Sequence, residues 1–185
     1  PPVLTFGTAP VPVPPGAFLQ ATLDGEAVLQ AAVSEALEDA KGAVVDLFCG
    51  VGTFALPLSQ SREVHAVEGV QDMLTALDAG WRHGKNLKSV SAECRDLFRR
   101  PLLQDELARF GAAVIDPPRA GAEAQTRELA KAQLPRIAFV SCNPVTFARD
   151  AEILTTAGYG IEWIDVVDQF RWSAHVELAA KFNLS

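Results

Sequence analysis

Cysteine is scarce in this sequence of 185 residues, and long apolar runs are missing. The three cysteines show no C-x-x-C spacing, which argues against a disulfide framework and a zinc site and indicates a reducing, cytoplasmic setting. No apolar stretch approaches the roughly 20 residues that a membrane span needs, and no charged and then apolar leader opens the chain. We therefore expect neither a membrane protein nor a secreted one.

Positive charge is also in short supply. Lys and Arg number 16 against 23 Asp and Glu, which gives a formal net charge of −7. Because affinity for a nucleic-acid backbone comes mostly from Lys and Arg, strong nucleic-acid binding by this chain alone is not expected. The chain opens on Pro1 and Pro2 without Met, so we expect a piece of a longer protein.

Strands alternate with helices along most of the chain. Residues 1–17 are rich in proline and are predicted to form an extended linker or arm, followed by one domain over residues 18–185. The patterns predict helices over 24–41, 53–59, 71–85, 123–132 and 144–157, and strands over 43–48, 64–67, around 90, 112–115, 136–140, 161–166 and 176–181. Asp24 and Asn143 are the expected caps of the first and last helices. This alternation is typical of a doubly wound α/β fold with helices on both faces of a parallel sheet and an antiparallel pair at its edge.

A glycine turn forms the first functional pattern. Residues 46–53, DLFCGVGT, are predicted to form a strand, a tight turn and a helix start, where glycine lets the backbone approach a ligand closely. Glu68 ends the next strand, and a carboxylate there can accept two ribose hydroxyls. A dinucleotide site carries a third glycine where this chain has Ala55, so the turn suits S-adenosylmethionine, which has no phosphate, better than NAD. The alternative is a tight connection that binds nothing.

Two further acids follow predicted strands. Asp96 is placed to accept a hydrogen bond from an adenine amine, although capping a helix is an equal alternative. Asp116 precedes Pro117 and Pro118 on a rigid turn that would direct its carboxylate into the crevice at the strand ends. A similar motif serves enzymes that methylate amino groups, so it does not name the acceptor, and a merely structural turn stays open.

Cys142 follows the fifth predicted strand, where a thiol can act as a nucleophile. Glu177 lies on the last strand, on the same face as His175 by the two-residue period. A carboxylate on an apolar strand is costly unless it has a role or a partner, so an ion-paired edge residue is the alternative. The remaining cysteines and histidines are given no role: Cys49 and Cys94 as core residues, His65 and His83 as surface or loop residues.

A thiol, a carboxylate and a methyl donor together indicate one reaction. Carbon 5 of a pyrimidine is a poor nucleophile until a thiolate adds to carbon 6, after which it can attack a sulfonium methyl group. A base then removes the carbon 5 proton and the thiol leaves by elimination. The thiol needs a lowered pKa or must lose its proton as it attacks, and the amino end of helix 144–157 would help.

Five motifs in this order resemble those of the RNA 5-methyluridine (uracil-5-) methyltransferases, which act on tRNA or large-subunit ribosomal RNA. The motifs are DLFCGVGTF from Asp46, VEGV around Glu68, DPPRAG from Asp116, VSCNP around Cys142 and HVE ending at Glu177. The resemblance runs from about residue 18 to the C-terminus. It implies a class I S-adenosylmethionine-dependent methyltransferase fold, with a doubly wound, mostly parallel sheet and an antiparallel C-terminal strand.

The resemblance also implies roles for the matching residues. Cys142 would be the nucleophile and Glu177 the base, with no metal site. The cofactor-binding residues would be Gln20, Phe48, Gly50, Thr53, Glu68, Asp96 and Asp116. The RNA partner would bind weakly to this chain, because the N-terminal RNA-binding region usual in the family is not in the sequence.

Some positions depart from the family pattern, and two other functions stay open. Thr22 and Thr53 stand where Asn is common, and residues 170–175 lack a usual Pro and Thr. A methyltransferase of amino groups would leave Cys142 and Glu177 without a task. A non-catalytic RNA-binding or assembly module would need a basic surface that the composition does not provide.

Overall fold

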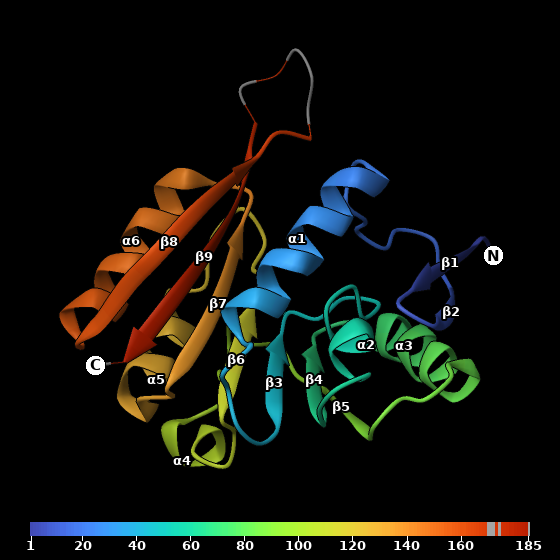
Figure 1. Ribbon diagram of the computed structural model, residues 1–185, viewed down its shortest axis with the longest axis horizontal. Coiled ribbons are helices and arrows are strands. Elements are labelled where there is room, and N and C mark those ends of the chain that lie inside the picture. The colour runs from blue at the N-terminus through green and yellow to red at the C-terminus, as the bar shows by residue number, and fades with distance from the viewer. Residues whose placement is uncertain (170–172, 174, 185) are drawn as a thin grey trace.

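The computed structural model describes residues 1–169, 173 and 175–184 (Figure 1). Within this part of the chain, seven strands form one sheet in the order β5-β4-β3-β6-β7-β9-β8. They are β3 (Val44–Leu47), β4 (Val64–Glu68), β5 (Val90–Cys94), β6 (Ala112–Ile115), β7 (Arg136–Ser141), β8 (Tyr159–Val167) and β9 (Glu177–Leu184). β3 to β7 pair in parallel, β9 runs antiparallel to β7, and β8 runs antiparallel to β9. The predicted doubly wound sheet with antiparallel strands at its end is confirmed.

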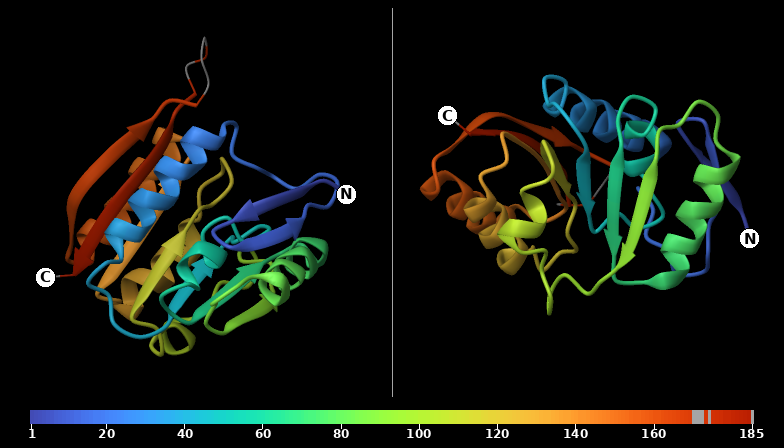
Figure 2. Two further views of the ribbon diagram at one scale, coloured as in Figure 1. Left: turned by 45° about the vertical axis from the view of Figure 1, so that its right-hand side comes forward. Right: turned by 90° about the horizontal axis from the view of Figure 1, so that it is seen from below.

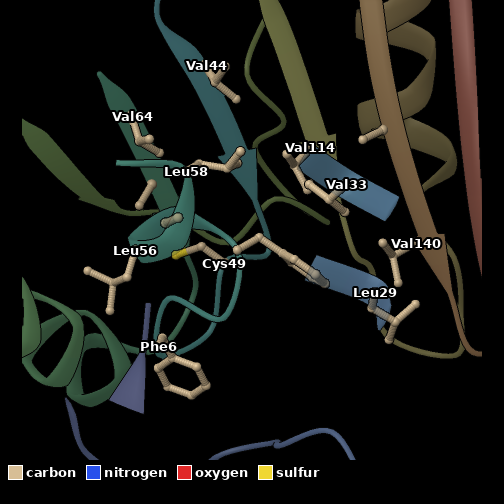
Figure 3. Packing of buried hydrophobic residues seen from close by; sticks show 14 of the residues in the cluster. Phe6, Leu29, Val33, Val44, Cys49, Leu56, Leu58, Val64, Val114 and Val140 are labelled. Atoms are coloured by element: carbon tan, nitrogen blue, oxygen red, sulfur yellow. The ribbon is translucent and has the colours of Figure 1, made fainter. Parts of the chain in front are cut away.

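Helices cover both faces of the sheet (Figure 2). The residues of α1 (Leu23–Ala36), α2 (Ala55–Leu58) and α3 (Gln71–His83) contribute to one apolar cluster. The residues of α4 (Gln104–Leu107), α5 (Glu123–Ala132) and α6 (Pro144–Thr156) contribute to a second cluster on the other face. Figure 3 shows part of the first cluster, in which Leu29 and Val33 of α1 lie close to Val140 and Val114 of the sheet. None of the described helices is both long and apolar enough to cross a bilayer.

The proline-rich residues 1–17 are not an extended linker. They contain a hairpin of β1 (Val3–Phe6) and β2 (Ala9–Pro12), which lies beside α3 in both Figure 1 and Figure 2. Its alternate residues Phe6, Ala9 and Val11 are buried, while the intervening prolines of β2 are half-buried. The prolines dominated the sequence pattern, whereas the apolar alternation between them decides the structure.

Gly80 of α3 allows this hairpin to pack closely. A Cβ atom at Gly80 would lie 2.4 Å from Cγ2 of Val11, far inside van der Waals contact. The hydroxyl of Thr8 in the hairpin turn donates to the carbonyl of Lys85 at 2.8 Å, just past the end of α3. The hairpin is therefore an integral part of the described domain.

Several smaller expectations are corrected. Thr22, not Asp24, caps α1: its hydroxyl accepts a hydrogen bond from the amide of Gly25 at 3.0 Å. Helix α1 ends at Ala36, earlier than predicted, and the short helix α4 was not predicted. Cys94 is exposed rather than in the core.

The two histidines that were given no role lie in different environments. His65 lies on β4 and its ring contacts Ser91 and Glu93 on β5, so it is neither a loop nor a free surface residue. His83 is exposed at the end of α3, as expected. The 170–175 departure from the family pattern falls mostly on residues outside those that the structure describes.

Candidate active site

A cavity of about 640 Å³ opens at the carboxyl ends of the parallel strands. It lies beside the neighbouring strands β3 and β6, from which the chain winds outward in opposite directions. This is where open α/β sheets bind ligands. All the predicted site residues line it: Gln20, Phe48, Gly50, Thr53, Glu68, Asp96, Asp116, Cys142 and Glu177.

Glu68 fixes the glycine turn at one end of the cavity. Its Oε2 accepts a hydrogen bond from the amide of Gly50 at 3.1 Å, and its Oε1 accepts one from the amide of Val70 at 3.0 Å. Each carboxylate oxygen keeps a further lone pair for a ligand. Gly50 has φ of 54°, and a Cβ atom there would meet nothing within 4 Å, so the turn leaves open space beside the carboxylate.

Aromatic side chains form a wall at the same end. Phe48 follows β3 with φ of 63°, an unusual backbone conformation for a residue with a side chain. Its ring centroid lies 5.4 Å from that of Phe98, with 54° between the ring planes. The sequence reading missed Phe98, although an aromatic residue two positions after the strand-end Asp96 is a usable signal. The two tilted rings offer an apolar surface in the cavity that Glu68 also lines.

Of the two functions considered from the sequence for Asp96, the structure shows the capping of backbone amides, here in a turn. Its Oδ1 accepts hydrogen bonds from the amides of Phe98 at 3.0 Å and Arg99 at 3.3 Å, which is the capping role. It also lines the cavity. Its side chain is 46% exposed, so much of its charge is screened by water.

Gln20 lines the cavity and is held in place by Gln169, which lies near the other end of the chain. The side-chain nitrogen of Gln169 donates to the side-chain oxygen of Gln20 at 2.8 Å, and the side-chain oxygen of Gln169 accepts from the amide of Thr22 at 3.3 Å. Gln169 is buried, so this amide pair fixes the segment ahead of α1. The carbonyl of Thr53 accepts from Gln30 of α1 at 3.0 Å, which ties the glycine turn to the same helix.

The register of the sheet brings Cys142 and Glu177 together. Ser141 at the end of β7 pairs with Leu178 of the antiparallel β9. Cys142 directly follows β7, and Glu177 is the first residue of β9, so the same register continued by one residue brings the two together. The charge of Glu177 accordingly acts on the thiol of Cys142. β9 begins at Glu177, and His175 therefore precedes the strand instead of sharing a face with Glu177.

Hydrogen bonds on both sides hold the loop that carries Cys142. The side-chain oxygen of Asn143 accepts from the amide of Val145 at 3.1 Å, which confirms Asn143 as the cap of α6. Its side-chain nitrogen donates to the carbonyl of Arg119 at 2.9 Å. Arg119 alone is basic among the described residues that line the cavity, and it was not in the predicted site.

The acids around Cys142 are held in an unfavourable environment. Glu177 is 2% exposed, and its Oε1 accepts no hydrogen bond from the described residues. Burial raises the pKa of Glu177 to about 7. Removal from water, together with the charge of Glu177, raises the pKa of Asp116 to about 7 as well.

The same environment shifts the pKa of the Cys142 thiol. Burial, and then the charges of Glu177 and Asp116, raise its pKa above the ordinary value, and Arg119 offsets only part of the effect. Cys142 therefore carries its proton near neutral pH, and the amino end of α6 does not reverse this. Of the two routes considered from the sequence, loss of the proton during attack is the one that fits.

Asp46 lies inside β3 and is completely buried. Neither of its carboxylate oxygens has a hydrogen bond of ordinary geometry with the described residues. Burial and then the charge of Asp116 raise the pKa of Asp46 well above its usual range, although the dipole of the Ala55 amide opposes the shift.

Comparison with known proteins places this geometry in context. Residues 15–182 match the family described as tRNA (uracil-5-)-methyltransferase. The chain is 55% identical over 179 residues to an uncharacterized RNA methyltransferase of Brucella suis, with 97% of this chain and 43% of the relative covered. It is 40% identical over 173 residues to the 23S rRNA (uracil(1939)-C(5))-methyltransferase of Pseudomonas entomophila, with coverage of 91% and 38%.

Solved structures are similar as well. The tRNA (uracil-54, C5)-methyltransferase of Pyrococcus abyssi, crystallised with S-adenosyl-L-homocysteine, has a TM-score of 0.83 and 27% identity, over 97% of this chain and 43% of that one. The magnesium protoporphyrin IX methyltransferase of Synechocystis, with a TM-score of 0.67 and 16% identity, shares the fold alone. The chain spans less than half the length of the curated relatives described above. Because the family match covers nearly all of its residues, the chain belongs to the tRNA (uracil-5-)-methyltransferase family.

Proposed function

We propose that residues 18–185 are the catalytic domain of an enzyme that methylates carbon 5 of a uridine in tRNA or ribosomal RNA, with S-adenosylmethionine as the donor. One observation carries the proposal: Cys142 and Glu177 lie just beyond the last pair of the β7–β9 register and line one cavity together with Glu68. A methyltransferase of amino groups has no use for this pair. The setting would be a reducing one, where the thiols stay free.

The cavity fits the donor in size and chemistry. Its volume of about 640 Å³ is in the usual range for sites of small molecules. Glu68 would hold the ribose hydroxyls and Asp96 the adenine amine, with the rings of Phe48 and Phe98 against the base. Gln20 and Thr53 would contact the rest of the donor. When bound, S-adenosylmethionine supplies the methyl group that carbon 5 receives.

The chain's own residues would carry the other steps. The sulfur of Cys142 forms a bond to carbon 6 of the uracil, and its proton passes to the carboxylate of Asp116. The electron pair of the carbon 5–carbon 6 double bond becomes available at carbon 5. Glu177 later removes the carbon 5 proton, the double bond forms again, and the sulfur leaves and recovers its proton. The uridine must be unstacked from its RNA helix for these groups to reach it.

Mass spectrometry with an RNA that contains 5-fluorouridine tests this proposal. Fluorine cannot leave as a proton does, so the protein incubated with this RNA and S-adenosylmethionine is expected to form a stable covalent adduct. Cys142→Ala should abolish the adduct. Cys94→Ala is the matched control, because Cys94 is exposed and does not line the cavity, and it should keep the adduct.

Two results would contradict the proposal. An adduct that survives in Cys142→Ala would exclude this thiol as the nucleophile. Lack of an adduct in a full-length protein that carries this domain and binds S-adenosylmethionine would exclude carbon 5 chemistry.

A further inference from the structure

The cavity has more acidic groups than its one described cation can balance. Its lining contains the carboxyl groups of Glu68, Asp96, Asp116 and Glu177, against the guanidinium of Arg119. Asp46 adds a further carboxyl group close enough to interact electrostatically with Asp116 and Glu68. The imbalance is large for a site that is partly closed to water.

The two ends of the cavity differ in how their acids are satisfied. Glu68 and Asp96 accept hydrogen bonds from backbone amides, and Asp96 also pairs with Arg99. Asp116 and Glu177, whose charges both act on the thiol of Cys142, form no ion pair with the described residues. Glu177 is 2% exposed, and its Oε1 is without a hydrogen bond there. A buried acceptor without a partner needs an explanation, and a ligand is a direct one.

A cationic ligand would satisfy this end of the cavity. Burying a carboxylate is costly unless a positive charge accompanies it. S-adenosylmethionine carries a permanent positive charge on sulfur, whereas its product, S-adenosylhomocysteine, is a neutral thioether with the same adenosine, amino and carboxylate groups. Only the charge and one methyl group distinguish them.

We propose, on the basis of the function proposed above, that Asp116 and Glu177 make the cavity selective for the charged donor over its neutral product and release a proton when the donor binds. The other charged and titratable groups that line the cavity are Cys49 after β3, Glu68 at β4, Asp96 after β5, Arg119 after β6 and Cys142 after β7. Asp46 of β3 interacts electrostatically with Asp116, and His175 lies two residues before Glu177. Arg119 is exposed and is the only opposing charge in the described lining.

The direction of the proton linkage follows from the environment of the two acids. With a pKa of about 7 for both Asp116 and Glu177, the free cavity is partly protonated near neutral pH. A positive charge nearby lowers the pKa of a carboxyl group, so the donor displaces protons, and its affinity falls as the pH falls below 7. The neutral product displaces none, and its affinity stays level.

This arrangement also keeps the charge of the cavity balanced through the reaction. Methyl transfer removes one positive charge from the donor side. The proton that Glu177 takes from carbon 5 removes one negative charge from the protein side. The spent product then faces a neutralised acid, and no electrostatic attraction retains it.

Calorimetric titration of the wild-type protein tests the proposal without any turnover. S-adenosylmethionine, S-adenosylhomocysteine and sinefungin, which has an amine in place of the sulfonium, are each titrated at pH 5.5 and 7.5 in buffers of different ionisation enthalpy. We expect both cationic ligands to bind at least ~10-fold more tightly than the product at pH 7.5, and the ratio to fall toward one at pH 5.5. Up to about one proton should be released per cationic ligand near pH 7, and none per product molecule.

Two isosteric variants show which carboxyl group sets the ratio of donor to product affinity. Asp116→Asn should reduce the ratio at pH 7.5 severalfold. Asp96→Asn, in the same cavity but half exposed, should weaken donor and product equally and leave the ratio unchanged. The wild-type titration decides the matter if a variant does not fold.

The outcomes separate this inference from the function on which it rests. Equal affinities for donor and product at both pH values, without proton release, would overturn the inference and leave the methyltransferase proposal in place. Failure of all three ligands to bind would overturn the proposed function and the inference together.

Discussion

At the scale of one residue, the buried carboxyl group of Glu177 lowers the stability of the folded protein when it is ionised. The side chain is buried at the start of β9, and its pKa of about 7 means that ionising it inside the protein is unfavourable. An acid that is partly protonated in the free protein near neutral pH, and ionises fully when a cation lies beside it, suits the proposed proton transfer. The same group weakens the folded state wherever the solution forces it to ionise.

Glu177→Gln is expected to stabilise the protein at alkaline pH. Because the folded protein holds this proton up to about pH 7 while the unfolded chain loses it near 4.5, the wild-type free energy of unfolding falls as the pH rises from about 4.5 to above 7. The variant removes this loss, which we put at about 1–2 kcal/mol after allowance for solvent screening. Urea denaturation at pH 5 and pH 8 measures it.

Glu162→Gln on the neighbouring strand β8 is the control. Glu162 is about half exposed and pairs with Lys181, and its pKa is lowered by hydrogen bonds from Asn183 and Lys181. Its replacement should lower stability slightly at pH 8 instead of raising it. Equal stability of Glu177→Gln and wild type at pH 8 would contradict the assigned burial cost.

At the scale of elements, the hairpin of β1 and β2 packs closely on α3 because Gly80 of that helix has no side chain. Helix propensity alone predicts that Gly80→Ala stabilises α3 by up to about 1 kcal/mol. The added Cβ atom would instead meet Cγ2 of Val11 at 2.4 Å. We expect a net loss of about 1–3 kcal/mol in the free energy of unfolding, because overpacking outweighs propensity.

Thermal or urea denaturation of three variants checks this prediction. Gly80→Ala should be destabilised, and Val11→Ala should be destabilised by loss of buried apolar surface. The double variant should recover part of the loss, because the methyl group at position 80 then occupies the space left at position 11. A stabilised single Gly80→Ala variant would show that the hairpin does not pack on α3 in solution.

The sequence predicted the strands of the large sheet and its longer helices better than it predicted the N-terminal hairpin and the short helix α4. β6, a fully buried apolar strand, and α5 both have the predicted bounds. The hairpin was missed because proline indicated a linker, and α4 because a helix of four residues carries no periodic signal. The capping of α1 by Thr22 was missed because Asp24, two residues later, has the stronger capping propensity.

The sequence predicted which residues gather at one cavity, whereas the electrostatics of that cavity was not predicted. The motifs brought every chosen residue into one cavity, since strand ends converge at one edge of a parallel sheet. The raised pKa values of Cys142, Asp116 and Glu177 depend on mutual distances and on burial, which no spacing along the chain reveals. Arg119 was missed for the same reason, whereas Phe98 could have been found from its position two residues after Asp96.

At the scale of the whole molecule, the net charge of −7 limits how this chain meets RNA. We expect it to bind a uridine-containing RNA stem-loop with a dissociation constant weaker than about 10 µM at 150 mM salt, with a shallow dependence on salt concentration. Fluorescence anisotropy with labelled RNA measures both quantities. A dissociation constant below 1 µM would contradict the prediction and would indicate that basic residues cluster on one surface despite the negative net charge.

The order of the strands has a consequence for synthesis on the ribosome. β8 leaves the ribosome before β9, yet β9 is its only described neighbour in the sheet. A nascent chain that has emerged only as far as β8 already contains the glycine turn, Glu68 and Cys142, but neither Glu177 nor a place for its edge strand. One late strand therefore completes the sheet and, in the proposed mechanism, brings the base to Cys142 at the same moment, so that a partly synthesised domain would hold the thiol without its proton acceptor.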